Sequence, residues 1–299
     1  MEWLSSIRRT IACLEEHLLD VEGEYDIYRE VGISSFYLQR GFQIMTGYTM
    51  AEYVRNRRLY LAALDVIADR EKVIDLAFKY GYETPEGFSK AFTRFHGVSP
   101  VQLRRDASRL CVFLPLKINI TVRGGNEMDY IVEREQAFTL IGFEKEFSAD
   151  DSYEQIPKFW DEYREKFCEK LIPGKAPQGE LETAVFNCHV GMFGVCIEKP
   201  DQNGRFRYLI AGIYTGGAVP EGMTLCEIPE TDWAKFSCRG PMPGALQSVN
   251  TKIFREWLPG NPDYDIAMGI NMEWYDEGDI GSADYKSAVW IPVRRKQAS

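Results

Sequence analysis

The sequence predicts two domains: an all-α N-terminal domain with two helix-turn-helix units, and an α+β C-terminal domain with two βαββ repeats around a cleft. A chain of 299 residues is long enough for two domains. Residues 3–107 show helical periodicity, whereas strand patterns dominate after residue 127. Each part also contains an internal repeat, which predicts the paired units.

The N-terminal helices are predicted from apolar spacing and from signals at their ends. Thr84-Pro85 and Ser99-Pro100 are typical of an N-cap followed by a first helical residue, where the missing N–H of proline costs nothing. Gly81 suits a left-handed C-cap. The predicted helices cover residues 3–19, 34–45, 50–68 and 72–80, with further helices starting after Thr84 and Ser99.

The N-terminal part of the sequence repeats itself at an offset of about 50 residues. Each unit is a short helix, a glycine turn, a capped second helix and a glycine exit. A second helix with an exposed outer face is what reading of a DNA major groove requires. The matched pairs are Ser34 with Thr84, Leu38 with Phe88, Arg40 with Lys90, Phe42 with Phe92, and Gly47 with Gly97.

The charge distribution is uneven. The chain carries a net charge of -10, but residues 32–110 hold 12 Lys and Arg against 8 Asp and Glu, a net of +4. Residues 1–31 carry -5 and residues 111–299 carry -9. A basic segment between acidic ones is a weak indication of a nucleic-acid surface, and taken alone the charge distribution favours chance scatter.

The N-terminal motifs resemble a known family. GYETPEGFSKAFTRFHGVSP and SSFYLQRGFQIMTGYTMAEYVRNRRL resemble the paired helix-turn-helix domain of the AraC/XylS family of bacterial transcription regulators, over residues 5–107. The resemblance implies that each second helix enters a major groove. By position it implies base contacts from Phe36, Gln39, Arg40, Glu86, Ser89 and Lys90, and phosphate contacts from Arg55, Arg57, Arg58 and Arg94.

The first unit departs from the family pattern. Tyr28 and Arg29 stand where relatives have small residues, whereas Ala77 keeps the small residue in the second unit. Gly41 should weaken its helix by about 0.5–1 kcal/mol relative to alanine. Distortion of the first unit, with weakened or drifted DNA specificity, therefore remains an open alternative.

The C-terminal part shows the order β-α-β-β twice. The first copy is predicted at residues 138–144, 153–171, 190–197 and 205–214, and the second at 225–236, 244–258, 264–275 and 285–293. The polar stretch VRGGNEMDY, residues 122–130, is typical of a linker. The expected domains are residues 1–110, a linker at 111–126, and residues 127–299.

This part resembles the GyrI-like effector-binding domain. The residues that carry the resemblance are AFTLIGFE, IPKFWDEY, YLIAGIYTG, GPMPGALQSVNTKIFREWLP and the closing MEWYD and VWIPV, over residues 127–296. Joined to an AraC-type N-terminus, the chain looks like the Rob-type architecture. The resemblance implies a cytoplasmic regulator that binds DNA and a small-molecule effector, with the effector changing how the C-terminal domain sits against the N-terminal one or against RNA polymerase.

Strand alternation indicates which residues line the cleft. Asn271, Glu273 and Tyr275 share one face of the strand predicted over residues 266–275. By resemblance Glu273 is the carboxylate of an aromatic cleft, which favours a lipophilic cation. The candidate aromatic walls are Trp160, Tyr208, Tyr214, Trp233 and Trp290, although aromatics in a small α+β domain more often belong to the core.

Other functions are weighed against a regulator. One is a hydrolase with Glu273 as general base beside a Tyr, and another is a ligand-sequestering module with vestigial DNA binding. We expect no enzyme, cofactor or metal. The seven Cys form no C-x-x-C pair, which fits reduced thiols better than a disulfide framework or a zinc site. Of the three His, His189 follows Cys188, but no second pair of ligands stands nearby at metal spacing. No apolar run reaches the length of a membrane span, and the N-terminus lacks a secretory signal.

Overall fold

The computed structural model describes residues 3–20, 27–69, 71–118, 128–148, 152–168, 177–198 and 205–296. By contacts the chain divides into two compact units. One unit contains Leu4–Gly32 and Thr46–Val122, and the other contains Met1–Trp3, Ile33–Met45 and Arg123–Ser299. The division places the helix of residues 35–46 almost entirely with the C-terminal part of the chain.

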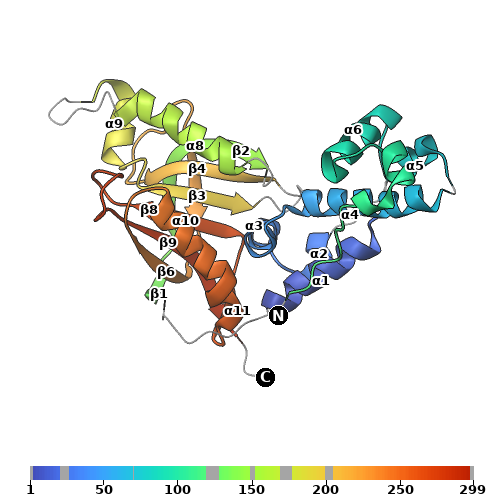
Figure 1. The fold of residues 1–299 in the computed structure, drawn as a ribbon. Coiled ribbons are helices and arrows are strands. Elements are labelled where there is room, and N and C mark those ends of the chain that lie inside the picture. The colour runs from blue at the N-terminus through green and yellow to red at the C-terminus, as the bar shows by residue number, and fades with distance from the viewer. Residues whose placement is uncertain are drawn as a thin grey trace. The chain divides into compact units, whose positions relative to one another are not determined.

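The helices of the first part follow the predicted order (Figure 1). Thr84 caps the sixth helix by accepting from the Gly87 N–H, and Thr49 forms a capping box with Glu52. Gly81 has a φ of 80°, as a left-handed C-cap requires. The helices are α1 (Trp3–Glu16), α2 (Ile27–Val31), α3 (Ser35–Thr46), α4 (Met50–Ala68), α5 (Val73–Lys79), α6 (Pro85–His96), α7 (Pro100–Arg105) and the 3-10 helix η1 (Ala107–Arg109).

The second helix-turn-helix unit has its own hydrophobic core. Phe88 and Phe92 of α6 are fully buried and their ring centroids lie 5.5 Å apart. They pack with Leu76 and Ala77 of α5 and with Leu59 of α4. Because the apolar side of α6 packs in this core, the opposite side of the helix faces outward.

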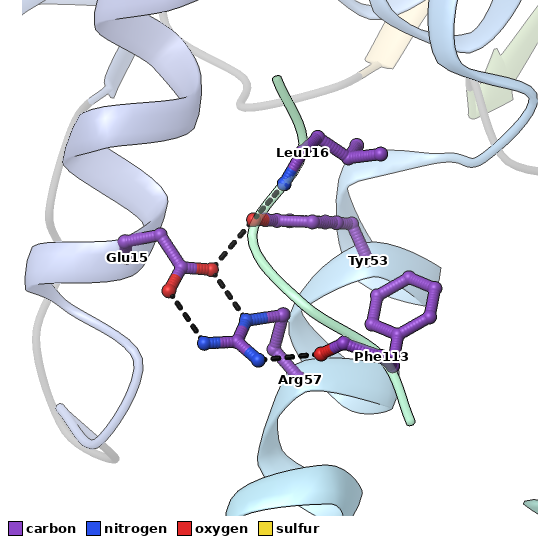
Figure 2. A network of polar contacts seen from close by, with 5 residues as sticks. All are labelled: Glu15, Tyr53, Arg57, Phe113 and Leu116. Carbon is purple, nitrogen blue, oxygen red and sulfur yellow. Dashed lines mark hydrogen bonds and ion pairs between the residues drawn. The ribbon is translucent and has the colours of Figure 1, made fainter. Parts of the chain in front are cut away.

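A polar network ties the chain after α7 to α1 and α4 (Figure 2). Arg57 donates to both Glu15 carboxylate oxygens, from Nε at 2.7 Å and from Nη2 at 2.9 Å, and from Nη1 to the Phe113 carbonyl at 2.5 Å. Tyr53 donates to Glu15 at 2.5 Å and accepts from the Leu116 N–H at 3.4 Å. One buried arginine therefore holds three separate segments together.

The C-terminal part is built on one antiparallel sheet. Nine strands are present among the described residues, in the order β1-β6-β9-β8-β3-β4-β2-β5, with β7 paired to the end of β9. They are β1 (Tyr130–Glu135), β2 (Phe138–Ser148), β3 (Phe193–Glu198), β4 (Arg205–Ile213), β5 (Thr224–Ile228), β6 (Thr231–Arg239), β7 (Tyr264–Ile266), β8 (Ile270–Tyr275) and β9 (Lys286–Arg295).

Helices cover one face of this sheet (Figure 1). Phe159 of α8 packs on Phe147 of β2, and Trp257 after α10 packs on Phe236 of β6. The central strands β3 and β8 therefore lie, within the sheet, between the strands covered by α8 and those covered by α10. The helical segments are α8 (Ser152–Tyr163) with η2 (Arg164–Cys168), α9 (Gly179–Asn187), and α10 (Gly244–Lys252) with η3 (Ile253–Trp257) and α11 (Leu258–Gly260).

The two-part fold class is confirmed, and several boundaries differ from the prediction. The strand expected over residues 225–236 is two strands, because the chain turns between β5 and β6. The strand expected over residues 264–275 is interrupted between β7 and β8. β1 and α9 were not predicted. Residues 119–127 of the expected linker, the loop KPDQNG at 199–204, and residues 169–171 of the expected helix lie outside the described residues. In the described part of the chain, each helix is too short or too polar to cross a membrane.

Candidate functional site

The outer side of α6 is accessible to a partner. Glu86, Lys90 and Arg94 are exposed and Ser89 is half-buried, while Phe88 on the other side is buried. This is the arrangement that a recognition helix needs, with its apolar side packed and its polar side outward. The three residues predicted at bases in the second unit therefore lie on the accessible side of α6.

The equivalent helix α3 is arranged differently. Every residue of α3 is buried or half-buried. Phe36 is only 6% exposed, and its ring centroid lies 5.2 Å from that of Phe206 in β4. Gln39 and Arg40 are half-buried. In this structure Phe36 and Arg40, two of the residues predicted at bases in the first unit, contact β4 and β8 instead of facing solvent.

The four arginines predicted at phosphates fall into two groups. Arg55 and Arg94 are exposed. Arg57 is 5% exposed because it is buried in the network of Figure 2. Arg58 donates from Nε to the Leu18 carbonyl at 2.5 Å, and its burial lowers its pKa. Arg57 and Arg58 thus serve the packing of α4, and only the exposed pair is placed to reach a phosphate.

A buried carboxylate lies on the sheet face between α8 and α10. Glu273 of β8 is 9% exposed and accepts a hydrogen bond from the Tyr275 hydroxyl at 2.7 Å. The Tyr208 hydroxyl of β4 lies 3.5 Å from the same carboxylate oxygen. Gly194 of β3 makes this approach possible, since a Cβ there would lie 2.2 Å from the Tyr208 hydroxyl.

An indole completes the cluster. Trp160 of α8 donates from Nε1 to the Tyr208 hydroxyl at 2.8 Å, and its ring centroid lies 5.2 Å from that of Tyr275. Burial raises the pKa of Tyr208 and of Tyr275, and the charge of Glu273 raises both further. Both phenols therefore stay protonated and act as donors near neutral pH. The structure brings together Glu273, Tyr275, Trp160 and Tyr208, and Asn271 lies buried on the same strand face.

A cation from α3 reaches this carboxylate. Arg40 Nη2 lies 3.5 Å from Glu273 Oε1, and the two side chains are 15% and 11% exposed. Burial raises the pKa of the neighbouring Cys196, while Arg40 lowers it and Glu273 raises it. All three groups thus share one small region of the sheet face.

Three of the predicted cleft residues lie elsewhere. In the antiparallel register Trp290 pairs with Met272 and with Lys235, so it projects from the face opposite Glu273. Trp233 shares that opposite face and is fully buried in its core. Both assignments are therefore corrected, because strand parity excludes them from the carboxylate cluster. Tyr214 follows β4, and its hydroxyl donates to the Gly217 carbonyl of its own turn.

Sequence reasoning missed several residues around α3. Tyr37 donates to the Ile270 carbonyl at 2.7 Å, and the Ser35 N–H donates to the Glu198 carboxylate. Both join segments far apart in the chain, so no local motif signals them. The one sequence feature that set this helix apart was the unusual glycine at position 41. Among the described residues, His, Cys, Asp and Glu form no group of three that could hold a metal.

Two family descriptions match this chain. Residues 27–106 match a helix-turn-helix domain, and residues 130–293 match the family described as integron-associated effector binding protein. The fold therefore joins an AraC-type helix-turn-helix region to a GyrI-like effector-binding domain. Because the second match covers more than half of the chain, the chain belongs to the integron-associated effector binding protein family.

Its relatives include known regulators. The chain is 27% identical to the transcriptional regulator Rob of Salmonella typhimurium over 184 residues, which is 59% of this chain and 60% of Rob. It is 33% identical to the regulatory protein SoxS of Escherichia coli K12 over 98 residues, or 33% of this chain and 92% of SoxS. The match thus spans about three fifths of Rob. Among solved structures, SAV2435 bound to tetraphenylphosphonium covers 56% of this chain and 94% of its own, at 22% identity and a TM-score of 0.45.

Proposed function

We propose that this chain is a DNA-binding transcription regulator of bacteria that acts in the cytoplasm and is controlled by a small lipophilic cation in its C-terminal domain. The observation that carries the proposal is the joining of two features in one chain. One is a helix-turn-helix region with an accessible recognition helix, α6. The other is a buried carboxylate among aromatic side chains, Glu273.

The DNA-binding part of the proposal rests on α6 and its neighbours. Lys90 can place a point charge on a guanine edge, and Glu86 can accept from a cytosine amino group. Arg94 of α6 and Arg55 of α4 are exposed and can hold phosphates on either side of the groove. RNA polymerase is the further partner that we propose for a regulator of this class.

The effector part rests on the chemistry around Glu273. A carboxylate that is 9% exposed needs a compensating charge, which the Arg40 guanidinium supplies at 3.5 Å in this structure and a cationic ligand can supply in its place. Two phenols and an indole surround the carboxylate. Aromatic faces attract cations, and their hydrocarbon area binds apolar groups. A delocalised monovalent cation carrying aromatic rings satisfies both requirements, whereas an anion or a sugar satisfies neither.

DNA binding is tested by selecting bound fragments from the source genome and measuring their affinity as a function of salt. Lys90→Ala should weaken the best fragment by about 1–3 kcal/mol and relax its sequence preference. Arg94→Ala should weaken all fragments alike and reduce the salt slope by about one unit. The matched control is Lys158→Ala, which removes an exposed lysine on α8. It should change neither the affinity for DNA fragments nor the salt slope. Absence of a preferred fragment at any salt would reject the DNA-binding part.

Effector binding is tested with tetraphenylphosphonium as the probe, followed through tryptophan fluorescence and calorimetry. Glu273→Gln keeps the side-chain shape but removes the charge, and should weaken binding at least ~10-fold. Glu227→Gln, on the exposed side of β5, is the matched control. Equal affinity of both variants and of the unchanged protein would reject the role of Glu273.

A hydrolase is the second function that one observation favours. The 2.7 Å hydrogen bond from Tyr275 to Glu273 resembles a general base with an orienting donor. Mass spectrometry of small electrophiles such as activated esters, before and after incubation with the protein, tests it. Turnover that disappears in Glu273→Gln would favour the hydrolase, and unchanged esters would leave binding as the function.

A further inference from the structure

Helix α3 is held along its length by residues of β3, of β8 and of the helical segment η3. At its start, the Ser35 N–H donates to the Glu198 carboxylate of β3. In its middle, Tyr37 donates to the Ile270 carbonyl of β8. Near its end, the Ile44 carbonyl accepts from Arg255 Nε at 2.8 Å. Contacts at both ends and in the middle describe a docked helix.

The contacting side of α3 has the chemistry of the proposed effector. The Arg40 guanidinium, a delocalised cation, faces Glu273 at 3.5 Å. Its Cζ lies 5.6 Å from the Phe36 ring centroid, and that ring packs edge-on against Phe206. A cation flanked by an aromatic ring is thus already placed at the carboxylate by the chain itself.

The unusual Gly41 belongs to this docking. A Cβ at position 41 would lie 2.2 Å from Trp3 Cζ2 and 3.1 Å from Phe254 of η3. Only a bare backbone lets the Trp3 ring reach this point, and the Trp3 and Phe254 ring centroids lie 5.7 Å apart. The repeat places Ala91 at the equivalent position of α6, so a helix-turn-helix unit accepts a Cβ there. Glycine at 41 therefore serves the docked arrangement.

The contrast with α6 shows that docking is not a general property of the two units. Glu86 and Lys90 occupy the positions equivalent to Phe36 and Arg40, and both are exposed. A groove-reading helix needs that side accessible to base edges. The same side of α3 cannot contact Glu273 and a base pair at the same time.

We infer that the Glu273 site has two alternative occupants, a cationic aromatic effector and helix α3 of the same chain, so that effector binding releases α3 for DNA. The inference rests on the proposed function and adds the regulation of its site. Docked α3 reduces the apparent affinity for the effector to the intrinsic affinity multiplied by the fraction of molecules in which the site is free. By linkage, an effector that displaces α3 must raise the affinity for DNA contacted by α3 by the same factor.

Two substitutions loosen the docked helix without touching the residues around Glu273. Glu198→Ala removes the acceptor of the Ser35 N–H, and Gly41→Ala displaces Trp3 while raising the helix propensity of α3. Their matched controls are Glu227→Ala, on the exposed side of β5, and Gly244→Ala, where a Cβ meets nothing within 4 Å. Loss of a hydrogen bond to a charged group should shift the docking equilibrium ~10-fold or more.

The first readout needs no ligand. Amide hydrogen exchange of residues 35–46 in the full chain should accelerate ~10-fold in Glu198→Ala and Gly41→Ala, with α6 amides and both controls unchanged. Unchanged exchange of α3 in both variants would overturn the inference, because the helix would then not be held by these contacts.

The second readout uses tetraphenylphosphonium. The probe should accelerate exchange of residues 35–46 in the unchanged protein, and both loosened variants should bind it more tightly. Binding that depends on Glu273 but leaves α3 protected, with equal affinity in all variants, would overturn the inference while the proposed function stands. Failure of even the loosened variants to bind the probe would overturn the effector part of the proposed function and the inference together.

Discussion

The arginine network of Figure 2 supports a quantitative prediction for Arg57→Met. Methionine keeps the apolar stem of the side chain and removes the guanidinium. Glu15 would then lose both hydrogen bonds from Arg57, and the Phe113 carbonyl would lose its donor at 2.5 Å. Among the described residues, the Tyr53 hydroxyl would be the one remaining donor to the carboxylate.

The magnitude follows from the burial of the pair. The side chain of Arg57 is 6% exposed and that of Glu15 is 23% exposed. Removing one partner of a buried ion pair costs about 3–5 kcal/mol, and the partial exposure of Glu15 favours the lower end. We expect α4 to lose about 3 kcal/mol of local stability, which corresponds to ~100-fold faster amide exchange.

The assay is hydrogen exchange of α4 amides at fixed pH in the full chain. Arg55→Met is the matched control, because Arg55 lies on the same helix and is exposed. In Arg55→Met, the change in α4 amide exchange should correspond to less than ~0.5 kcal/mol of local stability. A double variant with Glu15→Gln should cost less than the sum of the two single changes, since the partners are coupled.

A small effect would refute this reasoning. If Arg57→Met changed α4 exchange no more than Arg55→Met, the network would contribute no more than a surface ion pair.

Three further predictions concern a buried histidine, the cysteines and a helix cap. Burial lowers the pKa of His96, whose Nε2 lies 3.1 Å from the Leu59 carbonyl. The stability of the protein should therefore fall as the pH drops below 6.5, because the unfolded chain then takes up a proton that the folded chain does not. Thermal unfolding followed by circular dichroism checks this, and His96→Gln should flatten the pH dependence. A maleimide should label exposed Cys111 well before buried Cys196, whose pKa burial raises; peptide mapping decides, and equal rates would contradict the packing. Thr84→Ala should destabilise α6 by about 1 kcal/mol by removing its cap, and no change in α6 exchange would show that water caps the helix equally well.

The helices of the DNA-binding region were predictable because their signals are local. Thr84-Pro85, Ser99-Pro100 and Gly81 each set a helix end through backbone hydrogen bonds within a few residues. The cluster of Glu273, Tyr275 and Tyr208 followed from strand alternation and from the family resemblance. Helix-end signals and strand alternation need only the neighbouring sequence.

The misplaced residues depended on long-range pairing. The face to which Trp233 and Trp290 point relative to Glu273 is set by the register of β6, β9 and β8, which no single strand encodes. The burial of Arg57 likewise depends on Glu15, 42 residues away. The docking of α3 joins residues more than 200 positions apart, as Tyr37 and Ile270 show.

The most direct test of the central claim is the affinity of the full chain for its best selected DNA fragment, with and without saturating tetraphenylphosphonium. The account predicts that the probe tightens DNA binding, that Gly41→Ala shows the tighter binding without the probe, and that Glu273→Gln abolishes the response. Unchanged or weakened DNA binding in the presence of bound probe would contradict it, because an effector that displaces α3 from Glu273 must favour the DNA-bound state.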